Sequence, residues 1–335
     1  MKILIFGATG NCGRACFRHL TGRGHDVHAV ARSVPRDALM AERFYQGDIC
    51  DEALFSRLPD GIDAVINFAG VQPSILPVSE ATDRAATYRQ YVDINIRGVF
   101  NILEYCRNAG VARYLYATTH RDYENYWSGE SALTHDLPPA INYAGDHAMY
   151  AISKTSAKMI GDYFGTVHAM RVFNLRLPMI FLVPEEPYYL HDGKPELMPF
   201  LKIIRDALNG DTLEIWGEPT MRRDYVHIDN LIALVDACLE SPHASCTLNV
   251  GTGEGVTTER FVRRIGEVFS PPGKAPTFVY RPEKKTYKSA VYDIAFERQH
   301  FGYDPVLLNG MLERLQHALV EGGYPEQWGW HVNGG

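Results

Sequence analysis

The chain has few cysteines, and they lack the spacing of a structural cross-link. The six cysteines are spread over 335 residues and include no CxxC pair. This excludes a dense disulfide framework, and we expect the protein to reside in a reducing cytoplasm. Cys12, Cys16 and His19 could share one helix face, but small side chains packed on a helix are the simpler interpretation. No metal site is predicted.

Long apolar runs and long basic runs are also missing. No segment is long and apolar enough to span a bilayer, so no membrane partner is expected. The net charge of −7 argues against nucleic acid as the main partner, while leaving room for a local basic site for an anionic ligand. The predicted first strand begins at Lys2, so we expect no signal or transit peptide. With 46% hydrophobic residues, the chain can form one large domain or two lobes with a proper core.

The first twenty residues combine the features of a dinucleotide-binding turn. An apolar run over 2–6 predicts a buried strand, three glycines follow, and residues 14–20 predict a helix. The first glycine allows a tight turn, the second lets the backbone approach a pyrophosphate, and the third lets the helix pack on the strand. Free N–H groups at the helix start favour phosphate. An ordinary glycine-rich turn is the alternative. The residues predicted to bind the cofactor here are Gly7, Thr9, Gly10, Asn11, Cys12 and Gly13.

The predicted second strand, over 25–31, lacks a carboxylate at its end. An acidic residue at this place usually binds the ribose hydroxyls of NAD. The sequence here is Ala31-Arg32-Ser33, and Arg32 could pair with a 2′-phosphate. We therefore predict NADP in preference to NAD, without excluding NAD. A solvated arginine is the alternative interpretation of Arg32.

Strands and helices alternate through the first half of the chain. Further strands are predicted over 44–49, 63–68, 112–118 and 170–177, and long helices over 88–108 and 149–164. This alternation predicts an α/β fold with a doubly wound parallel sheet, with the ligand at the carboxyl ends of the strands. Residues at those ends that we expect near the cofactor are Asp48, Ile49, Phe68, Ala69 and Gly70.

After residue 178 the sequence becomes rich in proline and aromatic residues. Helices are predicted over 197–208 and 258–269, and a short strand over 213–217. A helix over 229–239 should return to the main sheet. We therefore predict a Rossmann-type domain from 1–178 with 218–252, and a smaller, interleaved substrate-binding lobe from 179–217 with 253–335.

A tyrosine and a lysine stand four residues apart in the predicted helix over 149–164. Tyr150 and Lys154 therefore share one helix face. An ammonium group beside a phenol favours the phenolate and lowers the tyrosine pKa from about 10, which suits reversible carbonyl–alcohol chemistry. Thr119 ends the preceding strand and could hydrogen-bond the same substrate oxygen; capping a turn is its alternative role. Tyr150, Lys154 and Thr119 are the predicted catalytic residues.

With these features the sequence resembles the extended branch of the short-chain dehydrogenase/reductase superfamily, the NAD-dependent epimerase/dehydratase family. The resemblance is specific for the family and much less specific for the reaction. It rests on Gly7/Gly10/Gly13, Gly47-Asp48-Ile49, Asn67-Phe68-Ala69-Gly70, Asn95-Ile96-Arg97-Gly98, Thr119 with Tyr150 and Lys154, Leu197-Met198-Pro199, and residues 222–230, 249–253 and 301–305.

The resemblance implies hydride transfer at nicotinamide C4, with Tyr150 as acid and base. It implies that Lys154 holds the nicotinamide ribose as well as tuning Tyr150, and that Asn95 belongs to the cofactor site. The family acts mostly on nucleoside-diphosphate sugars. Arg223, with Arg281 as a second candidate, would bind the diphosphate, which suits the paired donors of a guanidinium group.

Several residues depart from the family pattern. Family dehydratases and uronate decarboxylases carry acidic residues directly after the catalytic threonine, whereas this chain has His120 and Arg121, which disfavours elimination chemistry. Met179 stands where UDP-galactose 4-epimerase has an asparagine that contacts the sugar nucleotide. The loop over 120–148 is somewhat longer than usual, and its aromatic residues over 123–127 predict either a substrate lid or a packing cluster. His120 and Met179 are counted among the candidate substrate-binding residues.

These observations predict an enzyme of sugar-nucleotide metabolism, either an epimerase or a 4-keto reductase. Arg32 favours the reductase, and the overall resemblance favours the epimerase. A reductase of a non-sugar ketone is an alternative, supported by Met179. A cofactor-sensing protein without activity would be expected to lose the Tyr-Lys pair, which this chain retains. The helices over 88–108 and 149–164 resemble those that pair across a two-fold axis in the family, so we expect a homodimer.

Overall fold

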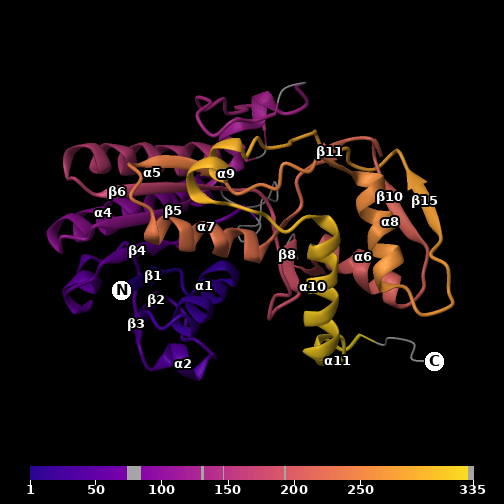
Figure 1. Ribbon diagram of the computed structural model, residues 1–335, viewed down its shortest axis with the longest axis horizontal. Helices are drawn as coiled ribbons and strands as arrows, with labels where there is room; N and C mark the ends of the chain where they lie inside the picture. Colours follow the sequence, from indigo (N-terminus) through magenta and orange to yellow (C-terminus); the bar gives the residue numbers. More distant parts are fainter. Residues whose placement is uncertain (74–83, 130–131, 146, 192–193, 331–335) are drawn as a thin grey trace.

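A computed structural model describes residues 1–73, 84–129, 132–145, 147–191 and 194–330 (Figure 1). Its centre is a seven-stranded sheet in the order β13-β6-β5-β4-β1-β2-β3, and every neighbouring pair of strands is parallel. The predicted doubly wound α/β fold is therefore confirmed. The strands are β1 (Lys2–Phe6), β2 (Asp26–Ala31), β3 (Phe44–Gln46), β4 (Ala64–Asn67), β5 (Arg113–Thr119), β6 (Arg171–Leu177) and β13 (Cys246–Asn249).

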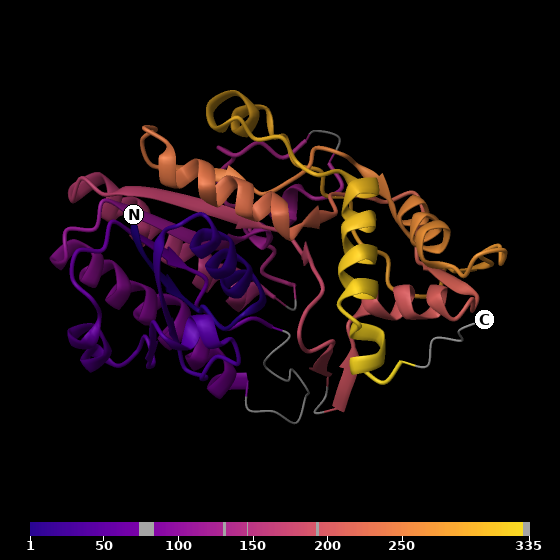
Figure 2. The ribbon, with the colours of Figure 1, turned by 60° about the horizontal axis from the view of Figure 1, so that its bottom comes forward.

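Helices cover both faces of this sheet (Figures 1 and 2). On one face, α1 (Asn11–Gly22) and α7 (Ile228–Glu240) contribute apolar side chains to the same core as Ile3 and Ile5. On the other face, α4 (Val99–Asn108) and α5 (Ala148–Val167) pack with Leu4 and Phe6. Because successive side chains of a strand point to opposite faces, the apolar residues 3–6 of β1 supply both cores.

A third apolar core lies beyond the sheet, around α6 (Pro199–Leu208), α8 (Thr258–Phe269) and α10 (Leu308–Glu321) in Figures 1 and 2. It is built mainly by these three helices. Short strand pairs surround these helices: β7 (Ile180–Phe181) with β12 (Val226–His227), β8 (Tyr188–His191) with β9 (Lys194–Leu197), β10 (Leu213–Trp216) with β15 (Phe278–Arg281), and β11 (Arg222–Arg223) with β14 (Val256–Thr257). By contrast, Tyr292, Ile294 and Tyr303 pack on the core of the sheet.

The remaining elements are short. They are α2 (Ala38–Ala41), α3 (Arg84–Gln90), α9 (Ala295–Phe301), α11 (Tyr324–Gln327), the 3₁₀ segments η1 (Glu52–Arg57) and η3 (His120–Tyr126), and a π-helical segment η2 (Tyr91–Gly98). The strand predicted over 44–49 is shorter than expected, because Asp48 turns the chain by accepting a hydrogen bond from the Cys50 amide. The helix predicted over 88–108 contains η2 instead of a regular α-helix throughout. Among the described residues, no helix has both the length and the apolar character needed to cross a membrane.

Candidate active site

The turn after β1 requires glycine at its first and third glycine positions. Gly7 has φ +73°, a backbone conformation that disfavours other residues, and a Cβ there would lie 2.6 Å from the Ala69 backbone nitrogen. A Cβ on Gly13 would collide with the Gly7 carbonyl oxygen. The tight turn and the close helix packing are thus physical requirements. They bring the Phe68-Ala69 turn against Gly7, at the carboxyl end of the sheet.

The first turn of α1 is open to an anion. Gly10 occupies the N-cap without a side-chain hydrogen bond, and no acidic residue lies in the first turn. The N–H groups and the positive end of the helix dipole are therefore not neutralised by the helix itself. Beside this turn lies a cavity of about 670 Å³, lined among others by Thr9 and Asn11. Its position beside the N-terminus of α1 suits the adenosine and pyrophosphate part of a dinucleotide.

Arg32 does not line this cavity, whereas its neighbours do. Ser33 and Arg36 are lining residues, and the Ser33 hydroxyl lies 3.0 Å from the Thr9 hydroxyl. The Arg32 carbonyl oxygen accepts a hydrogen bond from the Gln46 side chain. Ile49, also predicted near the cofactor, is 7% exposed and packs in the core against η2. The arginine that lines the cavity is thus Arg36, whereas the sequence pattern indicated Arg32.

Ion pairs that the sequence analysis missed close one side of the cavity. Glu185 pairs with Arg14 of α1, and Glu186 pairs with Arg36 at 2.9 Å. Tyr188 and Met198 complete this wall. No short-range signal marks these pairs, because the partners lie far apart in the sequence.

Lys154 is buried where the turn after β4 meets the helices. It is 5% exposed, and its Nζ lies 4.2 Å from the centre of the Tyr116 ring. A Cβ on Gly70 would lie 3.7 Å from this Nζ and 3.0 Å from Oδ1 of Asn95. Burial lowers the pKa of Lys154 to about 7.

The Asn95 side chain links the turn after β4 to α5. Its Oδ1 accepts a hydrogen bond from the Val71 amide at 2.8 Å, and its Nδ2 donates to the Val71 carbonyl oxygen and to the Ser153 hydroxyl. Asn95 lies in η2, and single π-turns of this kind are frequent at functional sites. The predicted residues Gly70, Asn95 and Lys154 are thus brought together.

Tyr150 and Thr119 meet at the carboxyl end of β5. Burial raises the pKa of Tyr150, and a hydrogen bond with the Thr119 side chain and the charge of Arg121 partly offset the rise. The predicted lowering of this pKa by Lys154 is therefore wrong for the protein alone, because loss of water penalises the charged forms of both groups. Thr119 also caps η3 by accepting a hydrogen bond from the Arg121 amide, so its alternative role as a turn cap is observed.

His120 extends this cluster toward the C-terminal segment. Its Nδ1 lies 2.8 Å from the Tyr292 hydroxyl, and its ring lies against Trp127 at 4.8 Å between centroids. Burial, followed by the charges of Arg121 and Arg223, lowers the pKa of His120 well below its ordinary value. The imidazole is therefore neutral at pH 7. No sequence pattern indicated Tyr292, which lies 172 residues from His120.

Arg223 lies close enough to His120 to influence it, and it stacks on Tyr287 at 4.9 Å. Its guanidinium forms no hydrogen bond or ion pair with any residue that the structure describes. The adjacent carboxylate of Asp224 instead accepts hydrogen bonds from the Thr252 side chain and from the Tyr292 amide.

The other two predicted substrate residues differ from Arg223 in their surroundings. Arg281, at the end of β15, donates to Glu214 at 3.0 Å, so its charge already has a partner. Met179 lies two residues after the end of β6 and is 50% exposed.

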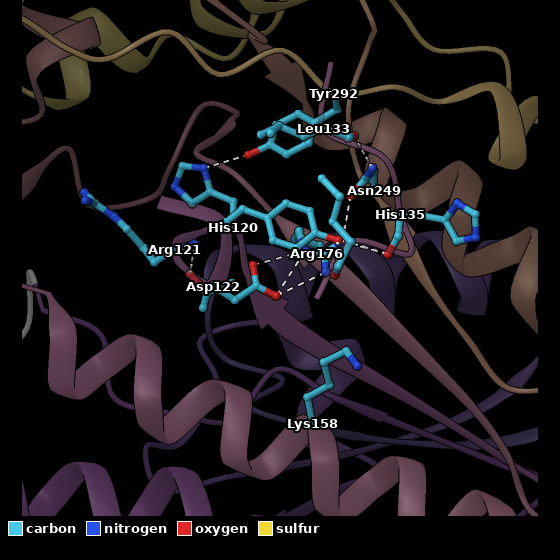
Figure 3. A network of polar contacts seen from close by, with 12 residues as sticks. His120, Arg121, Asp122, Leu133, His135, Lys158, Arg176, Asn249 and Tyr292 are labelled. Carbon is cyan, nitrogen blue, oxygen red and sulfur yellow. Dashed lines mark hydrogen bonds and ion pairs between the residues drawn. The ribbon is translucent and has the colours of Figure 1, made fainter. Parts of the chain in front are cut away.

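Figure 3 shows the polar network behind the cluster. Asp122 and Arg176 form an ion pair in which both side chains are almost fully buried, and the Arg176 guanidinium lies 3.6 Å from the Tyr123 ring. Arg176 also donates to Asn249. The Tyr123 hydroxyl donates to backbone carbonyls within 134–137, so this end of the 120–148 loop is a packing cluster. Residues 130, 131 and 146 of that loop lie outside the described residues. No group of His, Cys, Asp or Glu side chains that could hold a metal occurs among the described residues.

Comparison with known proteins identifies relatives over most of the chain. The sequence model of the NAD dependent epimerase/dehydratase family matches residues 3–251. The UDP-glucose 4-epimerase of Streptomyces lividans is 24% identical, with 98% of this chain and 96% of that protein covered. The dTDP-4-dehydro-6-deoxy-D-allose reductase of Streptomyces bikiniensis is 25% identical, with 81% and 82% covered.

Solved structures share the fold. The UDP-glucose 4-epimerase of Thermotoga maritima, solved with UDP-glucose, superposes with a TM-score of 0.72 at 21% identity, covering 95% of this chain and 100% of that chain. MoeE5, solved with UDP-glucuronic acid and NAD, gives a TM-score of 0.74 at 21% identity, covering 96% and 100%.

Proposed function

This chain belongs to the NAD dependent epimerase/dehydratase family, and on that premise we propose that it interconverts or reduces a nucleoside-diphosphate sugar. Relatives that are named as an epimerase and as a keto-sugar reductase support the reaction class. The observation that carries the proposal for the site is the meeting of Thr119 and Tyr150 beside the buried Lys154. The domain division predicted from the sequence, with a Rossmann-type part and a substrate lobe, is part of the proposal.

The protein's contribution to the reaction follows from these side chains. A bound nicotinamide ring supplies or accepts the hydride. The Tyr150 hydroxyl exchanges a proton with the reacting sugar oxygen, and Thr119 holds that oxygen by a hydrogen bond. Lys154 can bind the nicotinamide ribose and, when protonated, stabilise the Tyr150 phenolate. Tyr91 packs against Tyr150 at 6.0 Å between ring centroids and limits its movement.

Binding of the substrate is assigned to Arg223 and its neighbours. Arg223 carries a charge that has no partner among the described residues, so it can bind a diphosphate through two parallel donors. His120 and Met179 are placed on the sugar side. Arg281 is a weaker candidate, because a diphosphate would have to compete with Glu214 for it.

The cofactor is proposed to be a nicotinamide dinucleotide bound at the glycine turn. Neighbouring structures solved with NAD favour NAD, while Arg32 and Arg36, in the absence of a carboxylate at the end of β2, favour NADP. We retain NADP as the prediction to be tested. Substituting Arg32 or Arg36 will discriminate between the two.

The test of the reaction is the substitution Tyr150→Phe. It removes the exchangeable proton and keeps the ring, so we expect turnover to fall by about 10²–10⁴ while the fold and cofactor binding persist. Thr119→Val should lose less, because it removes one hydrogen bond. Turnover is measured on UDP-, dTDP-, GDP- and CDP-sugars by reduced-nicotinamide absorbance and product analysis. An isomerised product without net absorbance change identifies an epimerase, and stoichiometric consumption of NADPH identifies a reductase. Parental turnover in Tyr150→Phe would contradict the assigned centre.

A further inference from the structure

The contact between His120 and Tyr292 joins the catalytic strand end to the C-terminal segment. The two atoms, Nδ1 of His120 and the hydroxyl oxygen of Tyr292, lie 2.8 Å apart (Figure 3). Tyr292 is 2% exposed, so its hydroxyl is shielded from water. His120 directly follows Thr119, whose hydroxyl contacts Tyr150. A constraint on the His120 ring therefore acts beside the reacting groups.

The direction of this hydrogen bond follows from the need to satisfy a buried donor. If Nδ1 of His120 carried the proton, the Tyr292 hydroxyl hydrogen would have no acceptor among the described residues, at a cost comparable to a lost hydrogen bond. If the hydroxyl donates to Nδ1, the buried phenol has its acceptor, and the donor left unpaired is the Nε2–H group, which is not among the fully buried polar atoms that lack a partner. The neutral imidazole must then carry its proton on Nε2. That nitrogen has no hydrogen-bond partner among the residues that the structure describes.

Tyr292 is itself held firmly in place. Its backbone amide donates to Oδ2 of Asp224 at 2.8 Å, and a Cβ on Gly251 would lie 2.8 Å from the Tyr292 Cβ. Asp224 directly follows Arg223, the proposed diphosphate ligand. Tyr292 therefore connects two segments. Its backbone amide binds Asp224, next to Arg223, and its hydroxyl contacts His120, next to Thr119.

We propose that Tyr292 is a positioning residue: its hydroxyl fixes His120 in the tautomer with the proton on Nε2, so that His120 presents a hydrogen-bond donor to the substrate sugar beside Thr119. The second half of this statement rests on the proposed function. The statement that Tyr292 fixes the tautomer of His120 concerns the protein alone. Tyr292 touches neither substrate nor cofactor, and its effect passes through His120.

The first experiment measures the tautomer directly. Nitrogen chemical shifts of the His120 imidazole, recorded on the cofactor-free protein, should show the proton on Nε2. Tyr292→Phe keeps the ring and the backbone contact to Asp224, so the fold should persist while the imidazole becomes a mixture of tautomers. The matched control is Tyr303→Phe, which removes another buried hydroxyl, one that donates to the Gly251 carbonyl oxygen at 2.8 Å. Tyr303→Phe should leave the His120 shifts unchanged. An unchanged tautomer in Tyr292→Phe, or an equal change in both variants, overturns the proposal.

The second experiment tests whether the effect reaches the substrate. On the sugar nucleotide that the enzyme turns over, Tyr292→Phe should raise KM by about fivefold with little change in kcat, as expected for one hydrogen bond made equally in the ground and transition states. In a His120→Ala background, Tyr292→Phe should have less than about a twofold effect. Additive losses overturn the proposal. If no sugar nucleotide is turned over, the proposed function fails, and the tautomer measurement still decides the role of Tyr292.

Discussion

The amine of Lys154 lies in surroundings that disfavour its charged form. The aromatic face of Tyr116 is the one cation-binding group that lies against it among the described residues, and its side chain is 5% exposed. Burial therefore favours the neutral amine. A bound cofactor would give the ammonium form ribose oxygens as partners, so binding of cofactor and protonation of Lys154 should support each other.

This lysine should make the stability of the cofactor-free protein depend on pH. Its pKa is lowered from 10.5 to about 7, so between these values the unfolded chain binds more protons than the folded protein. At and below about pH 7, the buried charge of Lys154 destabilises the folded protein in full. As pH increases from about 7 to 10 this penalty falls, so the free energy of unfolding rises. Lys154→Met should flatten that rise and should stabilise the cofactor-free protein most at or below neutral pH. Urea unfolding at about pH 7 and pH 9.5 measures both effects.

Lys202→Met is the matched control for the pH dependence. Lys202 is 49% exposed and pairs with Asp206 on the surface of α6. Its removal should leave the pH slope of the unfolding free energy unchanged. Identical slopes for the parent protein and Lys154→Met would show that Lys154 keeps its ordinary pKa.

The cofactor preference can be tested at the two arginines near the end of β2. If NADP is the cofactor, Arg32→Ala should narrow the difference between NADP and NAD affinity. Arg36→Ala should do so only if Arg36 leaves Glu186, its partner at 2.9 Å, to bind the 2′-phosphate. Titration of the parent protein and both variants with each dinucleotide measures the six affinities. Equal affinities for the two dinucleotides in the parent protein would contradict the NADP prediction.

At the scale of elements, helix α1 contains two glycines with opposite surroundings. A Cβ on Gly13 would collide with the Gly7 carbonyl oxygen, whereas a Cβ on Gly22 would meet nothing within 4 Å. Gly13→Ala should therefore push the helix away from the turn, weaken dinucleotide binding and lower the melting temperature. Gly22→Ala should leave binding intact and should not lower stability, because alanine favours the helix. Thermal unfolding and dinucleotide titration of both variants check this. Equal binding by the two variants would contradict the role of Gly13.

The elements that the sequence predicted well are those specified by local periodicity. The helix predicted over 258–269 is observed as α8 with the same limits, because its buried residues recur every three or four positions on one face. The irregular elements were not predictable in this way. The π-turn in η2 has the periodicity of a helix, and β3 ends early because of one side-chain hydrogen bond from the Cys50 amide to Asp48.

In the candidate site, too, local patterns were predictable from the sequence and long-range contacts were not. The glycines and the Tyr-Lys spacing are local patterns, so their positions could be read from the sequence. The contacts of His120 with Tyr292, of Arg176 with Asp122 and of Arg14 with Glu185 join residues far apart in the chain. Only the packing of loops on the sheet brings them together, and no periodicity predicts it.

At the scale of the whole molecule, the helices of one outer face carry apolar side chains that no described part of the chain covers. On α5, Met159, Tyr163 and Val167 are each more than half exposed and recur every four residues. On the helical run from α3 to α4, Tyr88, Val92 and Phe100 are exposed at spacings of four and eight. Phe100 and Tyr163 both contact Phe164, so the two stripes are neighbours. Apolar stripes of this kind are commonly covered by a partner.

We expect this face to be covered by a second copy of the chain. Two helices from each copy would form a closed, isologous four-helix contact, which a two-fold axis permits because the same surface meets itself. The parent protein should therefore be a dimer by light scattering at micromolar concentration. Tyr163→Lys places charges close together across the axis in the centre of an apolar contact, so it should shift the equilibrium to monomer without unfolding the helix. Val320→Lys, on α10, changes a side chain that is 58% exposed outside this face and should leave the dimer intact. A parent protein that is monomeric, or a Tyr163→Lys variant that stays dimeric, would exclude this interface.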